Sequence, residues 1–145
     1  MKRIGRQQIT LFLALLLAGV LLSTCGPKDT LDGTSWALVA YGPADAPTPA
    51  AGGSLTFVDS RISGQVGCNT VSGEYEVDGD RLAFTNDELA FTVMGCPEDT
   101  PAGRQERFLR QWLGSGATMA REGDRLTLLF GEGRQVAEYT LEPES

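Results

Sequence analysis

The stretch Val66–Gly73, VGCNTVSG, places a cysteine between two turn-forming residues, directly before a run with the alternation of a β-strand. Gly67 and Asn69 tolerate backbone conformations that most residues avoid, so they allow the chain to turn sharply and to approach another segment closely. The chain of 145 residues has no histidine and only three cysteines. The role of Cys68 therefore decides between a reactive site and a structural corner.

Few residues in this chain are candidates for metal or catalytic chemistry. Histidine, the commonest general base and metal ligand, is absent. Cys68 and Cys96 alone do not supply the four soft ligands of a structural zinc site. Asp78–Asp80 lacks the further oxygen ligands of a calcium loop, and no spacing singles out a catalytic pair among the 19 acidic residues. We therefore predict a protein that is not an enzyme, with no catalytic residue, no metal ion and no cofactor.

The N-terminal segment has the features of an export signal. A short basic start is followed by an almost wholly apolar run from Ile9 to Leu22. That run is shorter than the roughly 20 apolar residues that a transmembrane helix needs, but it fits the core of a signal peptide. We therefore predict that residues 1–24 are a signal peptide, and the residues around Cys25 indicate that it is of the lipoprotein type.

Leu22–Gly26, LSTCG, resembles a bacterial lipobox, in which an aliphatic residue and two small residues precede the cysteine that is lipidated. Thr24 departs from the usual Gly, Ala or Ser. The resemblance implies a diacylglyceryl thioether and an acylated amine on Cys25, with palmitate-type chains, and residues 25–30 as a lipidated tether. Two or more acyl chains anchor a protein stably where one does not. An ordinary signal peptide cut nearby and an uncleaved anchor are the alternatives.

The charge balance excludes one class of partner. Removing residues 1–24 takes three of the 12 basic residues, Lys2, Arg3 and Arg6, and none of the 19 acidic ones, which leaves a net charge of −10. Such an acidic chain repels nucleic acid and anionic lipid surfaces. We expect a monomer that binds no nucleic acid and is attached to a membrane through Cys25. The predicted location is the bacterial cell envelope, facing outside the cytoplasm.

Export also bears on the two remaining cysteines. With Cys25 lipidated, Cys68 and Cys96 are the pair from which an exported protein makes one disulfide. The disulfide would close a loop of about 29 residues and stabilise the fold by about 3–4 kcal/mol. Two buried thiols, or a redox or nucleophilic role, are the alternatives. Cys96 is the better candidate for reactivity, because it lies shortly before a predicted helix.

Short alternating segments separated by Gly- and Asp-containing turns indicate an antiparallel sheet built from hairpins. Residues 42–53, rich in Pro, Ala and Gly, are expected to form an exposed loop. The predicted fold is α+β: one compact domain over 31–141, with a curved, barrel-like antiparallel sheet of about eight strands and one helix. The expected strand segments are 34–41, 54–58, 61–66, 73–77, 80–85, 89–94, 117–121, 124–130 and 135–141.

One helix is marked by its ends and by its apolar stripe. Thr100 is a suitable N-cap, Pro101 fits the first turn, and Gly114 is expected to close the helix as the residue just beyond its end. The apolar residues at helical spacing are expected to face the core rather than a ligand. They are Phe108, Leu109, Trp112 and Leu113.

An ordered set of motifs across 31–141 resembles the META (HslJ-like) domain. The matching motifs are Leu31–Trp36 (LDGTSW), Gly67–Asn69 (GCN), Ser72–Tyr75 (SGEY), Thr92–Pro97 (TVMGCP), Glu106–Leu109 (ERFL) and Gly123–Leu128 (GDRLTL). Val71 stands where the family tends to have an aromatic residue, and Val93 where it often has Arg. The absence of that Arg argues against a charged site beside Cys96.

The resemblance implies a small, barrel-like α+β domain of the kind found on secreted or lipid-anchored bacterial proteins. Relatives are associated with heat-shock, drug-resistance and motility or virulence phenotypes, and no catalytic activity is established for the family. The motif residues are therefore expected to maintain the fold.

The leading functional hypothesis is a lipid-anchored, non-enzymatic envelope protein that acts by binding, in stress tolerance or envelope maintenance. One alternative is a carrier of an apolar ligand, because a curved sheet capped by a helix can enclose a cavity. Another is an inhibitor or partner-binding module for an exported protein, using the 42–53 loop. The residues that would line a carrier's cavity, or else fill the core, are Trp36, Phe57, Phe84, Phe91 and Trp112.

Overall fold

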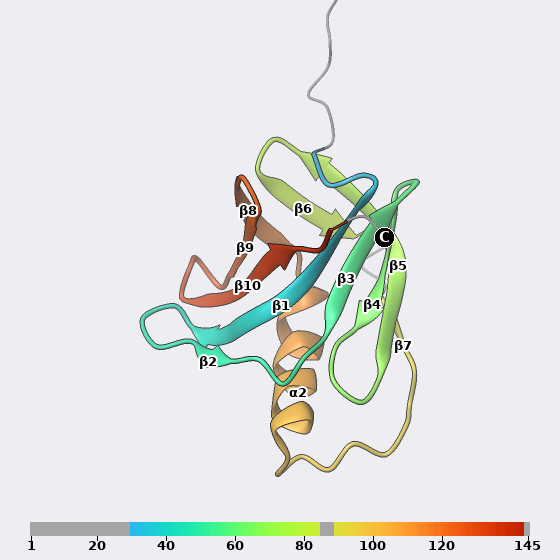
Figure 1. The fold of residues 1–145 in the computed structure, drawn as a ribbon, viewed down its shortest axis with the longest axis vertical. Coiled ribbons are helices and arrows are strands. Elements are labelled where there is room, and N and C mark those ends of the chain that lie inside the picture. The colour runs from blue at the N-terminus through green and yellow to red at the C-terminus, as the bar shows by residue number, and fades with distance from the viewer. Residues whose placement is uncertain (1–29, 85–88, 144–145) are drawn as a thin grey trace, which may run out of the picture.

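The computed structural model of the protein describes residues 30–84 and 89–143, shown in Figure 1. The predicted signal peptide (1–24) and residues 25–29 of the predicted tether, including Cys25, lie outside the described part of the chain. No helix in the described part of the chain is long and apolar enough to cross a membrane.

The described chain forms a ten-stranded antiparallel sheet and one α-helix, α2. β1 pairs with β3 on one side and with β10 on the other, so eight strands close into a barrel in the order β1-β3-β4-β5-β6-β8-β9-β10. This confirms the predicted α+β fold. The elements are β1 Thr34–Pro43, β2 Thr48–Pro49, β3 Ser54–Val58, β4 Arg61–Gln65, β5 Thr70–Asp78, β6 Arg81–Phe84, β7 Ala90–Phe91, α2 Pro101–Leu113, β8 Ala117–Glu122, β9 Arg125–Phe130 and β10 Gln135–Leu141.

Two-residue turns set the register of two hairpins. Asp78 pairs with Arg81 across the β5–β6 turn, and Glu122 pairs with Arg125 across the β8–β9 turn. Each turn begins with a glycine at positive φ, Gly79 at 63° and Gly123 at 59°. Such turns match the right-handed twist of paired strands, and glycine adopts their backbone angles without strain.

The core fills the barrel and reaches α2. In β9 every second residue is buried, as the alternation of the sequence predicts. From the helix, Leu109 and Leu113 are buried, and Phe108 packs against Tyr41 with ring centroids 5.3 Å apart. Figure 1 shows α2 beside the barrel, with its first turn at the far end of the molecule from residue 30.

The helix begins and ends where the sequence predicts, although the backbone at its end differs from the usual form. Thr100 is the N-cap, and its hydroxyl accepts a hydrogen bond from the Gly103 backbone N–H at 3.1 Å. Gly114 keeps a right-handed backbone, with φ −63°. Gly114 directly follows Leu113, the last helical residue, as predicted, but it does not adopt the left-handed conformation common for a glycine at a helix end. The left-handed residue is Gly116, whose N–H donates to the Leu113 carbonyl.

Two segments differ from the sequence prediction. The 42–53 loop is largely exposed, as expected, but β2 within it pairs with β1. The 89–94 segment forms only the two-residue β7, and the exposed fractions of Val93 and Met94 are 92% and 63%. Composition alone does not show which residues pair: β2 pairs with the strand directly before it, whereas β7 pairs with the more distant β5.

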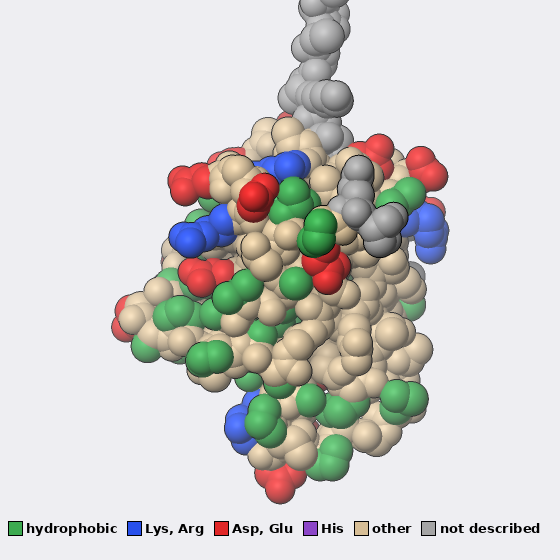
Figure 2. All heavy atoms as spheres, in the orientation of Figure 1, with side chains coloured by type: hydrophobic (Ala, Val, Ile, Leu, Met, Phe, Trp, Pro, Cys, Tyr) green, Lys and Arg blue, Asp and Glu red, His purple; other side chains and the backbone are tan. Residues whose placement is uncertain are grey.

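Charged side chains are most numerous toward one end of the face shown in Figure 2, although a few also lie at the other end. Acidic and basic groups cluster near the end where the described chain begins. Hydrophobic groups are more common along the side where the β1–β2 loop lies and toward the first turn of α2.

Candidate functional site at the disulfide corner

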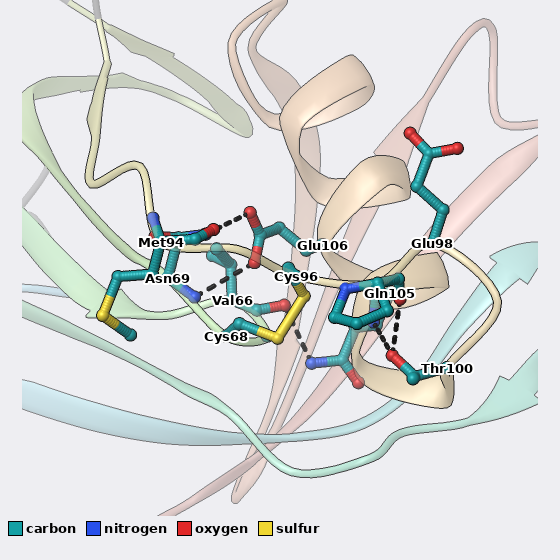
Figure 3. The surroundings of a disulfide bond; sticks show 12 residues. Val66, Cys68, Asn69, Met94, Cys96, Glu98, Thr100, Gln105 and Glu106 are labelled. Atoms are coloured by element: carbon teal, nitrogen blue, oxygen red, sulfur yellow. Dashed lines mark hydrogen bonds between the residues drawn. A yellow bond between two sulfur atoms is a disulfide. The ribbon is translucent and has the colours of Figure 1, made fainter.

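Cys68, in the loop between β4 and β5, forms a disulfide with Cys96, in the segment that leads into α2 (Figure 3). Their Cα atoms are 5.6 Å apart, and the two residues are separated by 28 positions in the sequence. That spacing lies within the usual range for a disulfide. The bond fixes the approach to the first turn of the helix against one edge of the barrel.

Asn69 is the central residue of this corner. Its side-chain amide donates to the Met94 carbonyl at 3.2 Å and to the Glu106 carboxylate at 2.8 Å. Its side-chain oxygen accepts from the Met94 N–H at 2.6 Å and from the Thr92 hydroxyl at 2.9 Å. All four hydrogen bonds that an asparagine side chain can make are therefore formed in a residue that is only 2% exposed.

Glu106 projects from α2 toward Asn69 and is buried, with 5% of its surface exposed. Its carboxylate accepts from the Asn69 backbone N–H at 3.0 Å, from the Asn69 amide and from Arg110 Nε at 2.9 Å. Burial raises the pKa of Glu106, but the hydrogen bonds from Asn69 and the nearby Arg110 guanidinium outweigh it, so that the pKa is lowered overall. The group is therefore an ionised acceptor at neutral pH.

Arg110 completes the neutralisation of this carboxylate. One guanidinium nitrogen donates to the Thr92 carbonyl at 2.7 Å, and the guanidinium carbon lies 4.5 Å from the centroid of the Phe91 ring. A buried carboxylate is tolerated when it is paired and its lone pairs are hydrogen-bonded. Arg110 thus ties the helix to the β7 segment and balances the charge of Glu106.

Gln105, the neighbour of Glu106 on the helix, secures a second loop. Its oxygen accepts from the Ala51 N–H at 2.8 Å, and its amide nitrogen donates to the carbonyls of Gly52 and Val66 at 2.7 and 3.0 Å. The side chain is fully buried. These bonds order the end of the 42–53 loop, for which the sequence predicted only exposure.

Gly67 allows the close approach that its sequence context predicts. A Cβ at Gly67 would lie 2.6 Å from the Ala102 carbonyl oxygen and 2.7 Å from Glu106 Cβ. Real Cβ atoms do not come that close, so any larger residue would push the corner away from the helix. The glycine next to Cys68 therefore positions the disulfide and the Asn69 side chain.

The chemistry open to this corner is limited by its bonding. The ligating atoms of Cys68, Cys96 and Glu106 lie within 4.8 Å of one another, a grouping that could hold a metal ion if the cysteines were thiolates. In the disulfide the sulfurs carry no such charge and are not nucleophiles. The Glu106 carboxylate is already occupied by three hydrogen bonds. In this state the geometry suits a structural role.

The charged pair beside Cys96 is a feature that the sequence interpretation missed. The valine at position 93 suggested that no charge would lie near Cys96, and that inference is wrong, because the helix supplies Glu106 and Arg110. A signal was present: Glu106 and Arg110 both lie within three positions of Leu109, which points into the core. Glu106, buried beside this leucine, therefore needs a partner of opposite charge, which the partly exposed Arg110 supplies one turn further along the helix.

The five aromatic residues considered for a ligand cavity divide into two groups. Trp36, Phe57 and Phe84 are buried members of the main core. Phe91 and Trp112 are partly buried and pack at its edge. The Asp78–Asp80 stretch lies at the β5–β6 hairpin turn.

Comparisons with known proteins agree with the fold. A protein from Burkholderia xenovorans solved by NMR is 25% identical, with a TM-score of 0.64 over 79% of this chain and 85% of its own. A second NMR structure is 24% identical, with a TM-score of 0.59 over 77% of this chain and 91% of its own. A DUF4847 family protein from Bacteroides vulgatus is 12% identical, with a TM-score of 0.58 over 83% of this chain and 100% of its own. The last two similarities concern the fold alone.

No curated protein matches the sequence. The model of the META domain family matches residues 29–142, which include the whole barrel, the disulfide corner and the helix. The resemblance drawn from the sequence motifs is thereby confirmed, and the chain belongs to the META domain family.

Proposed function

We propose that the protein is a lipid-anchored, non-enzymatic component of the bacterial cell envelope, which acts by binding in stress tolerance or envelope maintenance. The observation that carries the proposal is the lipobox-like Leu22–Gly26 stretch directly before a folded META domain. Leu31 is already fully buried in the core. The tether between Cys25 and the domain is therefore short, and it would keep the barrel close to the membrane surface.

The bonding at the corner supports a non-enzymatic role. The sulfurs of Cys68 and Cys96 are joined, and the polar groups of Asn69 and Glu106 are saturated by hydrogen bonds within the protein. Catalytic groups need a free nucleophile or a proton-transfer group within reach of a substrate. This bonding supports a structural task for Cys68, Asn69, Cys96 and Glu106.

Lipidation is tested by metabolic labelling with an alkyne analogue of palmitate in a bacterial host. The wild-type chain should incorporate the label and fractionate with membranes. Cys25→Ala should lose the label, whereas the double variant Cys68→Ala/Cys96→Ala should keep it. Labelling that survives Cys25→Ala would contradict the anchor, and a folded but unlabelled wild type would do the same.

The envelope role is tested in the source organism by deletion and complementation. Growth under heat, detergent and antibiotic stress should be impaired by deletion and restored by the wild-type gene. Restoration by Cys25→Ala should be poorer if attachment to the membrane matters. Normal growth of the deletion strain in all three conditions would contradict the proposed role.

A partner-binding module for an exported protein is the second candidate, and one observation favours it. The backbone at Met94 is held by two hydrogen bonds to Asn69, while the side chains of Val93 and Met94 are exposed. A rigid backbone that displays apolar side chains loses little entropy on binding. A photo-crosslinking residue at position 93 should capture a specific protein in cells, whereas one at Val58, which is 46% exposed, should not.

Equal capture at positions 93 and 58, or none at either, would contradict the partner-binding candidate. Neither result would bear on lipidation of Cys25, because the labelling experiment measures a different property.

A further inference from the structure

A hollow of about 760 Å³ lies on the side of the barrel, between the C-terminal end of α2, the start of β8 and the β9–β10 turn. Its lining includes Trp112, Gly131 and Phe130, together with polar side chains from the β5–β6 turn and from β8. None of the lining residues belongs to the disulfide corner. The volume is within the range of small-molecule sites.

Trp112 forms an aromatic wall of this hollow. Its ring lies against Gly131, where a Cβ would be 3.0 Å from a ring carbon, and Gly131 has a positive φ of 53°. Substituting Gly131 would strain its backbone and press on the ring, so this glycine leaves room for the indole where it stands. Among the described residues, the indole N–H of Trp112 has no hydrogen-bond partner. Trp112 is only partly buried, and its indole nitrogen is not one of the fully buried unpaired atoms of the described chain, so a ligand in the hollow can reach it.

The rim carries polar groups that are not used within the described part of the protein. The side chains of Asp80, Arg81, Thr118 and Glu132 are exposed and make no hydrogen bond or ion pair with another described residue. These four side chains place hydrogen-bond donors and acceptors around the Trp112 ring. They include both positive and negative charges. The two carboxylates outnumber the one guanidinium, so the hollow disfavours anions.

We propose that this hollow is a binding site for a neutral saccharide. A sugar ring presents an apolar C–H face, which suits the Trp112 ring, and a rim of hydroxyls that both donate and accept hydrogen bonds. A wholly apolar ligand would remove the rim groups from water without giving them partners, which is costly. The proposal names a ligand for the binding role proposed above and rests on that role, but it does not depend on the lipid anchor.

The test is NMR of the full chain with ¹⁵N-labelled tryptophan, in micelles of a detergent that contains no sugar. The chain has two tryptophans, so two indole N–H signals are expected. Trp36 is fully buried and donates to Thr34, and therefore serves as the internal control. Cellotriose, maltotriose and tri-N-acetylchitotriose are titrated separately to about 10 mM, the concentration range of weak binding.

At least one trisaccharide should shift the Trp112 signal in a saturable way and leave the Trp36 signal in place. Asp80→Asn/Glu132→Gln should weaken binding about tenfold, whereas the matched exposed variant Asp124→Asn should not change it. No shift with any of the three sugars, or equal weakening by Asp124→Asn, would overturn the proposal. Those results would leave the palmitate label at Cys25 unaffected, so failure of this site is distinguishable from failure of the anchor.

Discussion

The backbone N–H and the side-chain amide of Asn69 both donate to the Glu106 carboxylate, at 3.0 and 2.8 Å. This pair joins the β4–β5 loop to α2 across 37 positions of sequence. Asn69 also bonds the Thr92–Met94 segment, so a single side chain holds three parts of the chain together. The corner is thus maintained by hydrogen bonds as well as by the disulfide beside it.

Glu106→Gln should change the way in which the free energy of unfolding depends on pH. Its pKa is lowered in the folded protein, so its ionised form stabilises the fold above the unfolded-state pKa, about 4.5. That contribution is lost as the pH falls through the lower folded-state pKa. Glu106→Gln should therefore lower the free energy of unfolding by about 1–3 kcal/mol at neutral pH. Urea unfolding at a series of pH values should show the difference shrinking below the unfolded-state pKa.

The exposed Glu74, which pairs with Arg61 at 3.5 Å, provides the control for Glu106. Glu74→Gln should change stability by less than about 0.5 kcal/mol at any pH, because exposed ion pairs contribute little. A wild-type advantage over Glu106→Gln that stayed constant into strong acid would contradict the assigned charge state.

The disulfide should make both cysteines inaccessible to thiol reagents. When the exported protein is unfolded in urea without a reductant, Cys68 and Cys96 should remain unlabelled by iodoacetamide, and both should react after reduction. Cys68→Ala/Cys96→Ala should lower the free energy of unfolding by about 3–4 kcal/mol. Labelling of both cysteines before reduction would show that the native protein carries free thiols.

Tyr139 has a buried hydroxyl with no hydrogen-bond partner among the described residues. Burial raises its pKa well above the ordinary value, so the group stays neutral. Tyr139→Phe should leave stability unchanged or raise it by about 1 kcal/mol, because the unpaired hydroxyl is removed and the ring is kept. Tyr139→Leu, which removes the ring, should cost about 2–4 kcal/mol. A loss of more than about 1 kcal/mol in Tyr139→Phe would indicate a bound water or another partner.

Two glycine substitutions should have opposite effects. Gly67→Ala would place Cβ within 2.6 Å of the Ala102 carbonyl, so thermal unfolding should occur at a clearly lower temperature. Gly114 has helical angles, and a Cβ added there would meet nothing within 4 Å. Gly114→Ala should therefore stabilise the fold by about 0.5–1 kcal/mol. Similar effects of the two substitutions would contradict the close approach at Gly67.

The hairpins, the helix start and the fold class could be predicted from the sequence because local rules determine them. Glycine-containing turns between alternating runs predict which strands pair, and Thr100–Pro101 marks the helix start, although the two-residue turns lie one position later than the expected strand bounds imply. The closure of β1 on β10 pairs distant segments, and the alternation of either strand does not reveal it. The sequence motifs supplied that information only through their resemblance to a family.

The corner could be predicted in part. Gly67 and Cys68 were interpretable from backbone freedom and from the number of cysteines. The roles of Asn69, Gln105 and Glu106 could not be derived, because apart from the Glu106–Arg110 pair within the helix their partners lie 23 to 54 positions away in the sequence. Polar residues are usually exposed, and only tertiary structure shows that these three are buried and fully bonded.

The central claim is that the Asn69–Glu106 pair is a structural clamp, and a double-mutant cycle tests it most directly. The free energies of unfolding of the wild type, Asn69→Ala, Glu106→Gln and the double variant are measured in urea at neutral pH. The clamp predicts that each single variant is destabilised and that the loss in the double variant falls short of the sum of the two by about 1–2 kcal/mol. Additivity within about 0.3 kcal/mol would contradict the account, because it would mean that the two side chains do not support each other in the folded protein.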